Sequence, residues 1–360
     1  MNLPLARLRR TVRNPLRRLR GRGALLFGVS AGLLVTLTPV PPANAQGAAD
    51  FYRGRTINLI AGFNPGGGAD TYARIFARHL GKHIVGNPTV IVRNMQGAGS
   101  VVAANHIYNV SAKDGSELGL FAGNITIDPL MGGTQHKYDA HKFNWIGSPA
   151  GDSNVCLSAR GSSFKTLDDA LAREMVIGTS GTSTLDFPVV LNNVIGTKFR
   201  LVKGYAGSAA LRLAMDRGEV EGFCGVSFNS MRTAGLTDGR ANILVQIGLA
   251  RNPKMPDVPF VIDYAKREED RQIFRLVFGW LDLERPIAAP PGTPHDRVAA
   301  LREGFDRATT DPALLGDAEK AQVDVQPMRG SAIASFVEDA YRTPPAVAAK
   351  AAQMLGRAAQ

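Results

Sequence analysis

The sequence has 360 residues, of which 44% are hydrophobic and 20% charged, and its formal net charge is +11. This is the composition of an ordinary globular protein without repeated tracts, and after residue 50 no apolar run is long enough to span a bilayer. A chain of this length is longer than a single hydrophobic core usually organises, so two domains are expected.

The first 45 residues have the pattern of an export signal. Eight arginines precede an uncharged run at residues 23–40, and Ala43, Asn44 and Ala45 form a small-x-small cleavage site. An uncleaved membrane anchor is the alternative, because the uncharged run approaches the length of a span. The prolines at 39, 41 and 42 favour cleavage near Ala45 and a periplasmic mature protein, with Sec and twin-arginine export both open.

Loss of this leader changes the meaning of the charge. The leader holds eight arginines and no acidic residue, so the mature chain carries 11 − 8 = +3. No basic cluster with interleaved aromatic residues remains, and the sequence therefore predicts no nucleic-acid partner.

Residues 57–63 form a short apolar run with β-branched residues, which predicts a strand. Asn64, Pro65 and three glycines follow, and from Tyr72 the apolar residues recur at the spacing of one helix face. A glycine-rich turn between a strand and a helix lets the backbone approach a ligand and leaves the first helical amides without partners. Because such amides favour an anion, we predict an anion-binding corner here.

Two more strand–turn units follow in the first half. Strands are predicted at residues 89–92 and 118–122, a helix at 101–110, and turns at 94–100 and 123–129. Such repeated units predict a parallel sheet with helices on both faces. Since ligands bind at the carboxyl ends of parallel strands, the turns at 64–70, 97–100 and 123–128 are expected to form one wall of a pocket.

A second set of units begins after residue 154. Strands are predicted at residues 155–158, 175–178, 199–203, 220–224 and 243–247, with a helix at 166–173. A hydroxyl-rich turn at 179–184 and a glycine-containing turn at 204–208 each precede a predicted helix. Residues 286–294 are predicted to cross back to the first set, and a helical stretch from residue 332, interrupted at 344–345, ends the chain.

Cys156 and Cys224 are the only cysteines, and both lie in predicted strands of the second set. Export to an oxidising compartment permits a disulfide. Strand pairs rarely satisfy disulfide geometry by accident, however, and buried free cysteines are common. The balance favours free thiols, and the pairing stays open.

No motif predicts a metal site, a cofactor or a catalytic centre. His79 and His83 are four residues apart on one predicted helix, with no third metal ligand in the pattern. The glycines at 66–68 lack the flanking residues of a nucleotide-binding loop. Ser162 and Lys165 match a short β-lactamase pattern whose partner motifs are missing, and no nucleophile–base–orienter set can be proposed.

Several motifs in order resemble one known family. They are GFNPGGGADTYAR, RNMQGAGS, GSPAG, GTSGTS, KGYAGSAALRLAMDRGEVEGF, RNPKMPDVPF and APPGTP, and they cover residues 50–345. The chain resembles the Bug-type periplasmic solute-binding proteins of tripartite tricarboxylate transporter systems.

The resemblance implies an α/β fold of the two-lobed periplasmic binding protein class (type II-like). Each lobe would be a mainly parallel sheet flanked by helices, with the ligand in the inter-lobe cleft. Residues 46–154 and 286–360 would form the first lobe and residues 155–285 the second. The implied function is that of a monomeric receptor, without cofactor or catalysis, that captures a small organic carboxylate and delivers it to membrane transporter subunits. A periplasmic α/β enzyme acting on a small carboxylate and a ligand-presenting partner of a sensor histidine kinase are the alternatives.

In this family one ligand carboxylate is held by backbone amides and waters at the first two turns, and the second lobe sets selectivity. The ligand-binding residues that the turns and the resemblance together predict are Phe63, Asn64, Pro65, Gly66, Gly67, Gly68, Ala69, Asp70, Gly97, Ala98, Gly99, Ser100, Asn124, Thr126, Thr179, Ser180, Gly181, Thr182, Ser183, Asp186 and Tyr205.

The sequence departs from the family pattern at some of these positions. Asn64 stands where a second proline is usual, Ser100 where a glycine is common, and Asp186 close to where a histidine is frequent. Asp186 would suit a ligand amine, or it would be a helix cap without a ligand role. Asp70 is best interpreted as a helix-start residue that fixes its turn. The identity of the ligand stays open.

Overall fold

The structure is a computed structural model that describes residues 43–66, 68–132, 135–181, 183–237 and 239–357. Most of the predicted leader lies outside the described residues, as do Gly67 and Thr182, and cleavage near Ala45 stays a prediction. Within the described ranges no helix is both long and apolar enough to cross a bilayer.

The first sheet has six strands in the order β11–β4–β10–β3–β1–β2. β1 (Thr56–Ala61) pairs in parallel with β2 (Thr89–Asn94) and β3 (Glu117–Leu120). β10 (Ile287–Ala289) inserts antiparallel between β3 and β4 (Asn144–Ser148), and β11 (Met328–Arg329) pairs antiparallel with β4. The carboxyl ends of β1, β2 and β3 therefore meet at one edge of this sheet.

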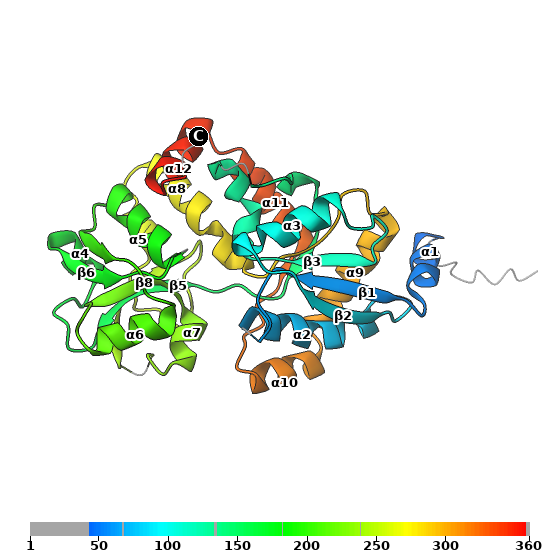
Figure 1. Ribbon diagram of the computed structural model, residues 1–360, viewed down its shortest axis with the longest axis horizontal. Coiled ribbons are helices and arrows are strands. Elements are labelled where there is room, and N and C mark those ends of the chain that lie inside the picture. The colour runs from blue at the N-terminus through cyan, green and yellow to red at the C-terminus, as the bar shows by residue number, and fades with distance from the viewer. Residues whose placement is uncertain (1–42, 67, 133–134, 182, 238, 358–360) are drawn as a thin grey trace, which may run out of the picture. The chain divides into compact units, whose positions relative to one another are not determined.

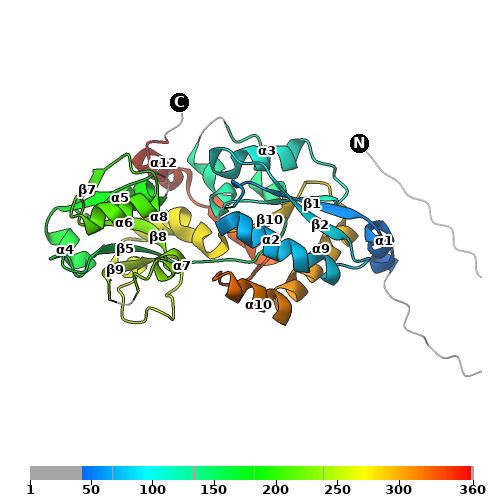
Figure 2. The same cartoon turned by 60° about the horizontal axis from the view of Figure 1, so that its bottom comes forward.

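Helices cover both faces of the first sheet (Figure 1). One face carries α2 (Gly68–Leu80) and α9 (His295–Ala308), and α1 (Ala43–Tyr52) packs on α9. α10 (Pro312–Lys320) lies beside α2 (Figure 2). The other face carries α3 (Val101–Asn109) and α11 (Gly330–Tyr341). Successive residues of β1 point to opposite faces, so Leu59 joins the first core and Ile60 the second.

The second sheet has five strands in the order β7–β6–β8–β5–β9. β6 (Met175–Gly178) pairs in parallel with β7 (Phe199–Val202) and β8 (Gly222–Ser227). β5 (Asn154–Ala159) runs antiparallel to both β8 and β9 (Ala241–Ile247).

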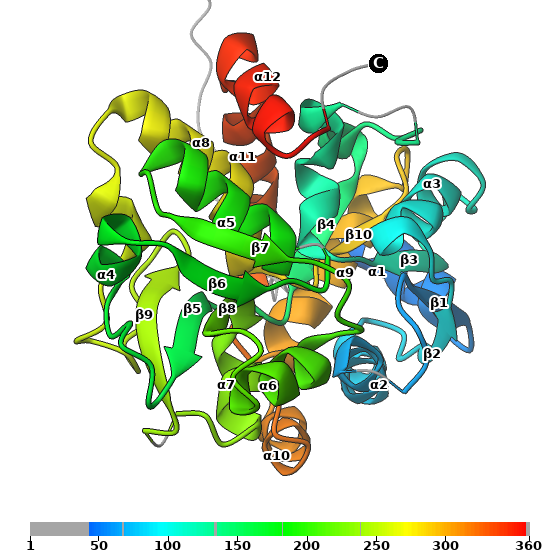
Figure 3. The same ribbon diagram turned by 60° about the vertical axis from the view of Figure 1, so that its left-hand side comes forward.

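Helices also cover both faces of the second sheet. α4 (Leu167–Ala172), α5 (Ser183–Val194) and α8 (Glu268–Phe278) pack on one face, and α6 (Ser208–Asp216) and α7 (Phe228–Thr233) on the other. The C-terminal helix α12 (Pro345–Met354) contacts α5 and α8 (Figure 3). Its Ala351 is buried in the same core as Phe274.

The prediction of an α/β fold with two helix-flanked sheets is confirmed. Each sheet is mixed where a mainly parallel one was expected. The difference comes from the strands next to the crossings, because β10 returns between β3 and β4, and β5 enters between β8 and β9 against their direction.

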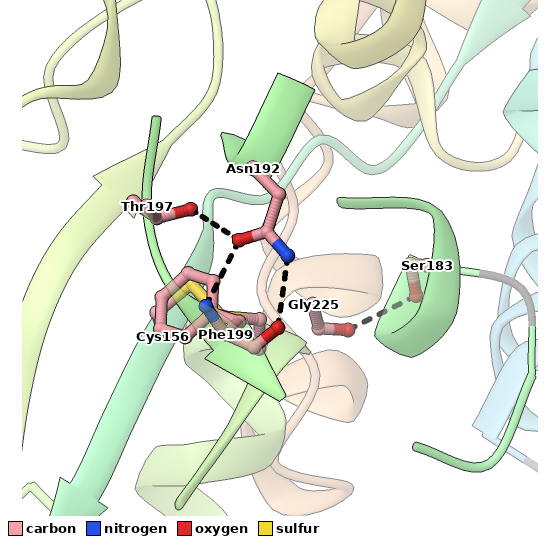
Figure 4. Close-up of a disulfide and its surroundings, with 7 residues drawn as sticks. Cys156, Ser183, Asn192, Thr197, Phe199 and Gly225 are labelled. Atoms are coloured by element: carbon pink, nitrogen blue, oxygen red, sulfur yellow. Dashed lines mark hydrogen bonds between the residues drawn. A yellow bond between two sulfur atoms is a disulfide. The ribbon is translucent and has the colours of Figure 1, made fainter. Parts of the chain in front are cut away.

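The expectation of free thiols is wrong, because Cys156 and Cys224 form a disulfide (Figure 4). The two residues are directly opposite each other on the antiparallel strands β5 and β8, with Cα atoms 3.9 Å apart. This register brings the two thiols together, and it depends on a pairing of strands 68 residues apart that no local pattern reveals.

Candidate functional site

The turn after β1 is held by its own side chains. The Asp70 carboxylate accepts hydrogen bonds from the Gly66 N–H (2.9 Å), Arg74 Nε (2.8 Å) and Asn94 Nδ2 (2.8 Å). Burial acts to raise the pKa of Asp70, but these hydrogen bonds, with Arg74 foremost, hold that pKa at about 2. Asp70 therefore fixes the turn at the start of α2, the role expected of a helix-start residue.

Ser100 joins the turns that follow β1, β2 and β3. Its side chain is buried, and its Oγ donates to the carbonyl of Gly62 (3.0 Å) and accepts from the N–H of Ala122 (3.1 Å). Ser100 and Gly99 both have positive φ, 76° and 61°. Ser100 thus ties three strand ends together.

Replacing Ser100 by alanine is expected to lower the free energy of unfolding by about 2–3 kcal/mol, because the Gly62 carbonyl and the Ala122 N–H would both lose their partner inside the protein. Chemical denaturation of the wild type and Ser100→Ala measures the change. An unchanged midpoint and slope would show that water replaces the hydroxyl at no cost and that the three turns are held by other contacts.

The second wall is formed where α5 and α6 begin. The Ser183 hydroxyl donates to the carbonyl of Gly225 on β8 (3.0 Å), and the Thr184 hydroxyl accepts from the Ser180 N–H (2.8 Å) (Figure 4 shows the first of these bonds). At the opposite end of α5, Asn192 bonds to both the N–H and the carbonyl of Phe199. The first turn of α5 is therefore fixed against β8 and the helix as a whole against β7.

Two crossing segments, residues 149–153 and 281–286, join the sheets side by side. The Asp152 N–H donates to the Leu281 carbonyl (3.0 Å), and the Glu284 N–H donates to the Ala150 carbonyl (2.9 Å). The Arg285 N–H donates to Ser148 Oγ (3.1 Å).

Asp152 is a buried acid within this crossing. Its carboxylate accepts from the N–H of Asn229 (3.1 Å). Burial, and next to it the charge of Glu284, raise the pKa of Asp152 to about 7. The folded protein therefore binds this proton more tightly than the unfolded chain, and the ionised carboxylate opposes folding increasingly as pH rises from about 4 to about 7.

Replacing Asp152 by asparagine is expected to raise the free energy of unfolding at pH 8 by about 1–3 kcal/mol, and by less at pH 4. The amide oxygen still accepts from Asn229 but carries no charge. Denaturation of both proteins from pH 4 to pH 8 measures the difference, with the exposed Asp216→Asn as control. If the gain in the free energy of unfolding does not grow with pH, the ionised Asp152 carboxylate is stabilised by its surroundings in the folded protein.

A cavity of about 400 Å³ lies between the two walls and the crossing. Its lining includes Gly99, Ala122 and Asn124 from the first wall, Trp280 from the short helix η7 (Gly279–Leu283), and Glu284 and Arg285 from the crossing. The second wall contributes Ser180, Ser183, Asp186, Ser208, Gly225 and Ser227, and the chain after α12 contributes Leu355 and Arg357. Helices α5 and α6 both begin at this cavity, since Ser183 and Ser208 are their first residues.

Arg357 connects two acids at the cavity. Its Nη1 donates to Asp128 (3.1 Å), which also accepts from Asn124, and its Nη2 donates to Asp186. Asp128 lies on the short helix η4 (Asp128–Met131) and Asp186 in the first turn of α5. The sequence did not indicate this ion pair, and the two interpretations of Asp186, an amine partner or a helix cap, stay predictions.

Of the predicted site residues, Gly99, Asn124, Ser180, Ser183 and Asp186 line the cavity. Ser100, Thr126 and Thr179 are buried, and the Thr126 hydroxyl donates within its own turn to Gly123. The other predicted residues that the structure describes are not among the residues lining this cavity, namely Phe63, Asn64, Pro65, Gly66, Gly68, Ala69, Asp70, Gly97, Ala98, Gly181 and Tyr205. A ligand-binding role for the predicted residues stays a prediction.

Sequence reasoning missed Ser208, Gly225 and Arg357 as cavity residues, and it placed Asp128 in a wall turn without naming it as a site residue. Gly225 carried a usable signal, because a glycine inside a strand indicates a bulge or a close backbone approach. The register of β5 and β8 shifts between Val155 and Cys156, opposite this residue. Arg357 carried none, since nothing in a C-terminal tail indicates that it returns to a cavity.

Comparison with known proteins supports the family resemblance. Residues 72–351 match the model of the tripartite tricarboxylate transporter family receptor. A relative from Cupriavidus necator, the UPF0065 protein in the gbd 5′ region, is 25% identical over 332 residues, which are 90% of this chain and 95% of the relative.

Solved structures share the fold. A TctC solute-binding protein from Polaromonas is 21% identical with a TM-score of 0.67, covering 85% of this chain and 99% of that one. R. palustris Rpa4515 with adipate is 19% identical with a TM-score of 0.60, covering 85% of this chain and 99% of that one. Since the family model spans most of the sequence, the chain belongs to the family of tripartite tricarboxylate transporter receptors.

Proposed function

We propose that the mature chain is a periplasmic receptor that binds a small organic carboxylate in the cavity and delivers it to membrane subunits of a tripartite tricarboxylate-type transporter. The observation that carries this proposal is the convergence of the α5 and α6 N-termini on the cavity. The first amides of each helix have no acceptor within the helix, and the helix dipole favours an anion there. The adipate described with the R. palustris relative is a ligand of this chemical class.

A non-catalytic role agrees with the lining of the cavity. The described residues that line it include serines but no histidine, cysteine or lysine that would act as base or nucleophile. Of its three carboxylates, Asp128 and Asp186 are engaged by Arg357, and Glu284 lies 3.6 Å from Arg285. Binding without chemical change therefore fits better than an enzyme of the same build.

We also propose two lobes that close on the ligand, with residues 46–154 and 286–344 in the first lobe, and residues 155–285 together with the chain from 345 in the second. The packing of α12 on α5 and α8 supports moving the chain from residue 345 onward to the second lobe. Hinged closure about the crossing at 149–153 and 281–286 is the motion that this division predicts.

The test is mass spectrometry of the small molecules released when protein purified from the periplasm is denatured. One small carboxylate at about one molecule per chain is expected, and an unrelated periplasmic protein purified in the same way is the control. The released molecule should be recovered unchanged after incubation with fresh protein. A released molecule without a carboxylate, or conversion to a product, would contradict the proposal.

A further inference from the structure

The ionisable groups around the cavity are unevenly balanced. The described lining holds three acids, Asp128, Asp186 and Glu284, but two bases, Arg285 and Arg357. With all of them ionised, these side chains sum to a charge of −1, which is unexpected in a site that binds an anion.

The excess lies in the cluster of Asp128, Asp186 and Arg357, here named the aspartate–arginine cluster. One guanidinium is divided between two carboxylates, giving one hydrogen bond to each. The Asp128 and Asp186 side chains are only 11% and 17% exposed. Burial raises the pKa of Asp186 to about 6 even though Arg357 opposes this shift, which indicates that one cation does not fully compensate the pair.

The other base is only partly paired. Arg285 donates through Nη1 to the carbonyl of Glu284 (2.8 Å), and its Nη2 is 3.6 Å from the Glu284 carboxylate. Its Nε is buried and has no hydrogen-bond partner in the described part of the chain. Arg285 is therefore the one cation of the described lining outside the aspartate–arginine cluster, and together with the helix N-termini it suits one ligand carboxylate.

A second ligand carboxylate would have no comparable partner. At the aspartate–arginine cluster it would compete with Asp128 and Asp186 for the same guanidinium. It would also add a third negative charge beside two largely buried carboxylates. Breaking a buried ion pair in this way leaves an uncompensated carboxylate, which is strongly unfavourable. A neutral or ammonium-bearing end avoids both problems.

We propose that the aspartate–arginine cluster is the specificity determinant of the receptor and selects ligands with one carboxylate and a neutral or cationic remainder over dicarboxylates. This inference rests on the proposed function, since it names the charge class of the ligand that the same cavity takes. The receptor would then differ in ligand class from its structural relative with adipate.

Two trios of equal chain length test the proposal: hexanoate, 6-aminohexanoate and adipate, and butyrate, 4-aminobutyrate and succinate. Titration calorimetry at pH 8 measures each dissociation constant. In a trio that binds, at least one monocarboxylate is expected to bind tenfold or more tightly than the dicarboxylate.

Two variants that change the charge of the cluster in opposite directions distinguish a role in ligand specificity from a purely structural role. Asp186→Asn removes one negative charge and should improve the binding of the dicarboxylate, relative to the monocarboxylate, by about tenfold, or 1.4 kcal/mol. Arg357→Gln removes the cation and should shift this ratio the other way. A merely structural cluster would weaken all members of a trio alike and leave the ratio unchanged.

Each outcome is decisive. A wild-type preference for the dicarboxylate, or a ratio unmoved by both variants, would overturn the proposal and leave the receptor function intact. If neither trio binds, the molecule released from the purified protein decides: one carboxylate supports the proposal and two or more overturn it. A released molecule without any carboxylate would contradict the proposed function itself.

Discussion

Replacing Cys156 and Cys224 together by alanine is expected to lower the free energy of unfolding by about 4 kcal/mol. The disulfide joins residues 68 positions apart and thereby restricts the unfolded chain over most of the second sheet. The loop that it closes includes α5 and α6, whose first residues line the cavity. Guanidinium denaturation of the oxidised wild type and the double variant measures the loss.

Reduction provides the control for this prediction. The wild type denatured with a reducing agent should behave like the double variant, while the double variant itself should not respond to the agent. A loss below 1 kcal/mol would mean that residues 156–224 of the unfolded chain are already compact without the disulfide.

The second large effect is expected at Gly225, where alanine should lower the free energy of unfolding by about 3–5 kcal/mol and weaken ligand binding at least tenfold. Gly225 has a φ of +71°, and a Cβ atom there would lie 2.3 Å from the carbonyl oxygen of Ser183. The variant must therefore adopt a left-handed conformation and push the first turn of α5 away from β8. Denaturation and the amount of ligand retained after purification measure the two effects.

Gly196→Ala is the matched control. Gly196 has a similar φ of +81° but open space where its Cβ would be, and it lies beyond the end of α5 remote from Ser183. This variant should lose only about 1 kcal/mol and retain its ligand. Equal losses in the two variants would show that backbone conformation, and not the contact with Ser183, explains the effect at Gly225.

Much of the fold could be predicted because its signals are local. The glycine-rich turn before Tyr72 marks the end of β1 and the start of α2, and the strand predicted at residues 175–178 coincides with β6. The mixed pairing could not be predicted in the same way. β10 and β11 have only three and two residues, too few to show a period, and their places in the sheet depend on contacts with distant strands.

The residues of the candidate site show the same difference between local signals and contacts with distant segments. Gly99 and Asn124 were predicted because turns at the carboxyl ends of parallel strands gather at one edge, and Ser183 was predicted from the family resemblance. Arg357 was missed, and Asp128 was placed in a wall turn without a role, because their role comes from a contact across 229 positions of sequence. Asp186 was predicted as a site residue, but its partner is a side chain of the same protein that the sequence around it does not indicate.

The most direct test of the central claim is a crystal structure of the protein with the carboxylate that it releases on denaturation. We expect the ligand in the cavity between the two sheets, with its carboxylate within hydrogen-bond distance of amides in the first turn of α5 or α6. A ligand bound elsewhere, or one in the cavity whose carboxylate contacts neither helix N-terminus, would contradict the account.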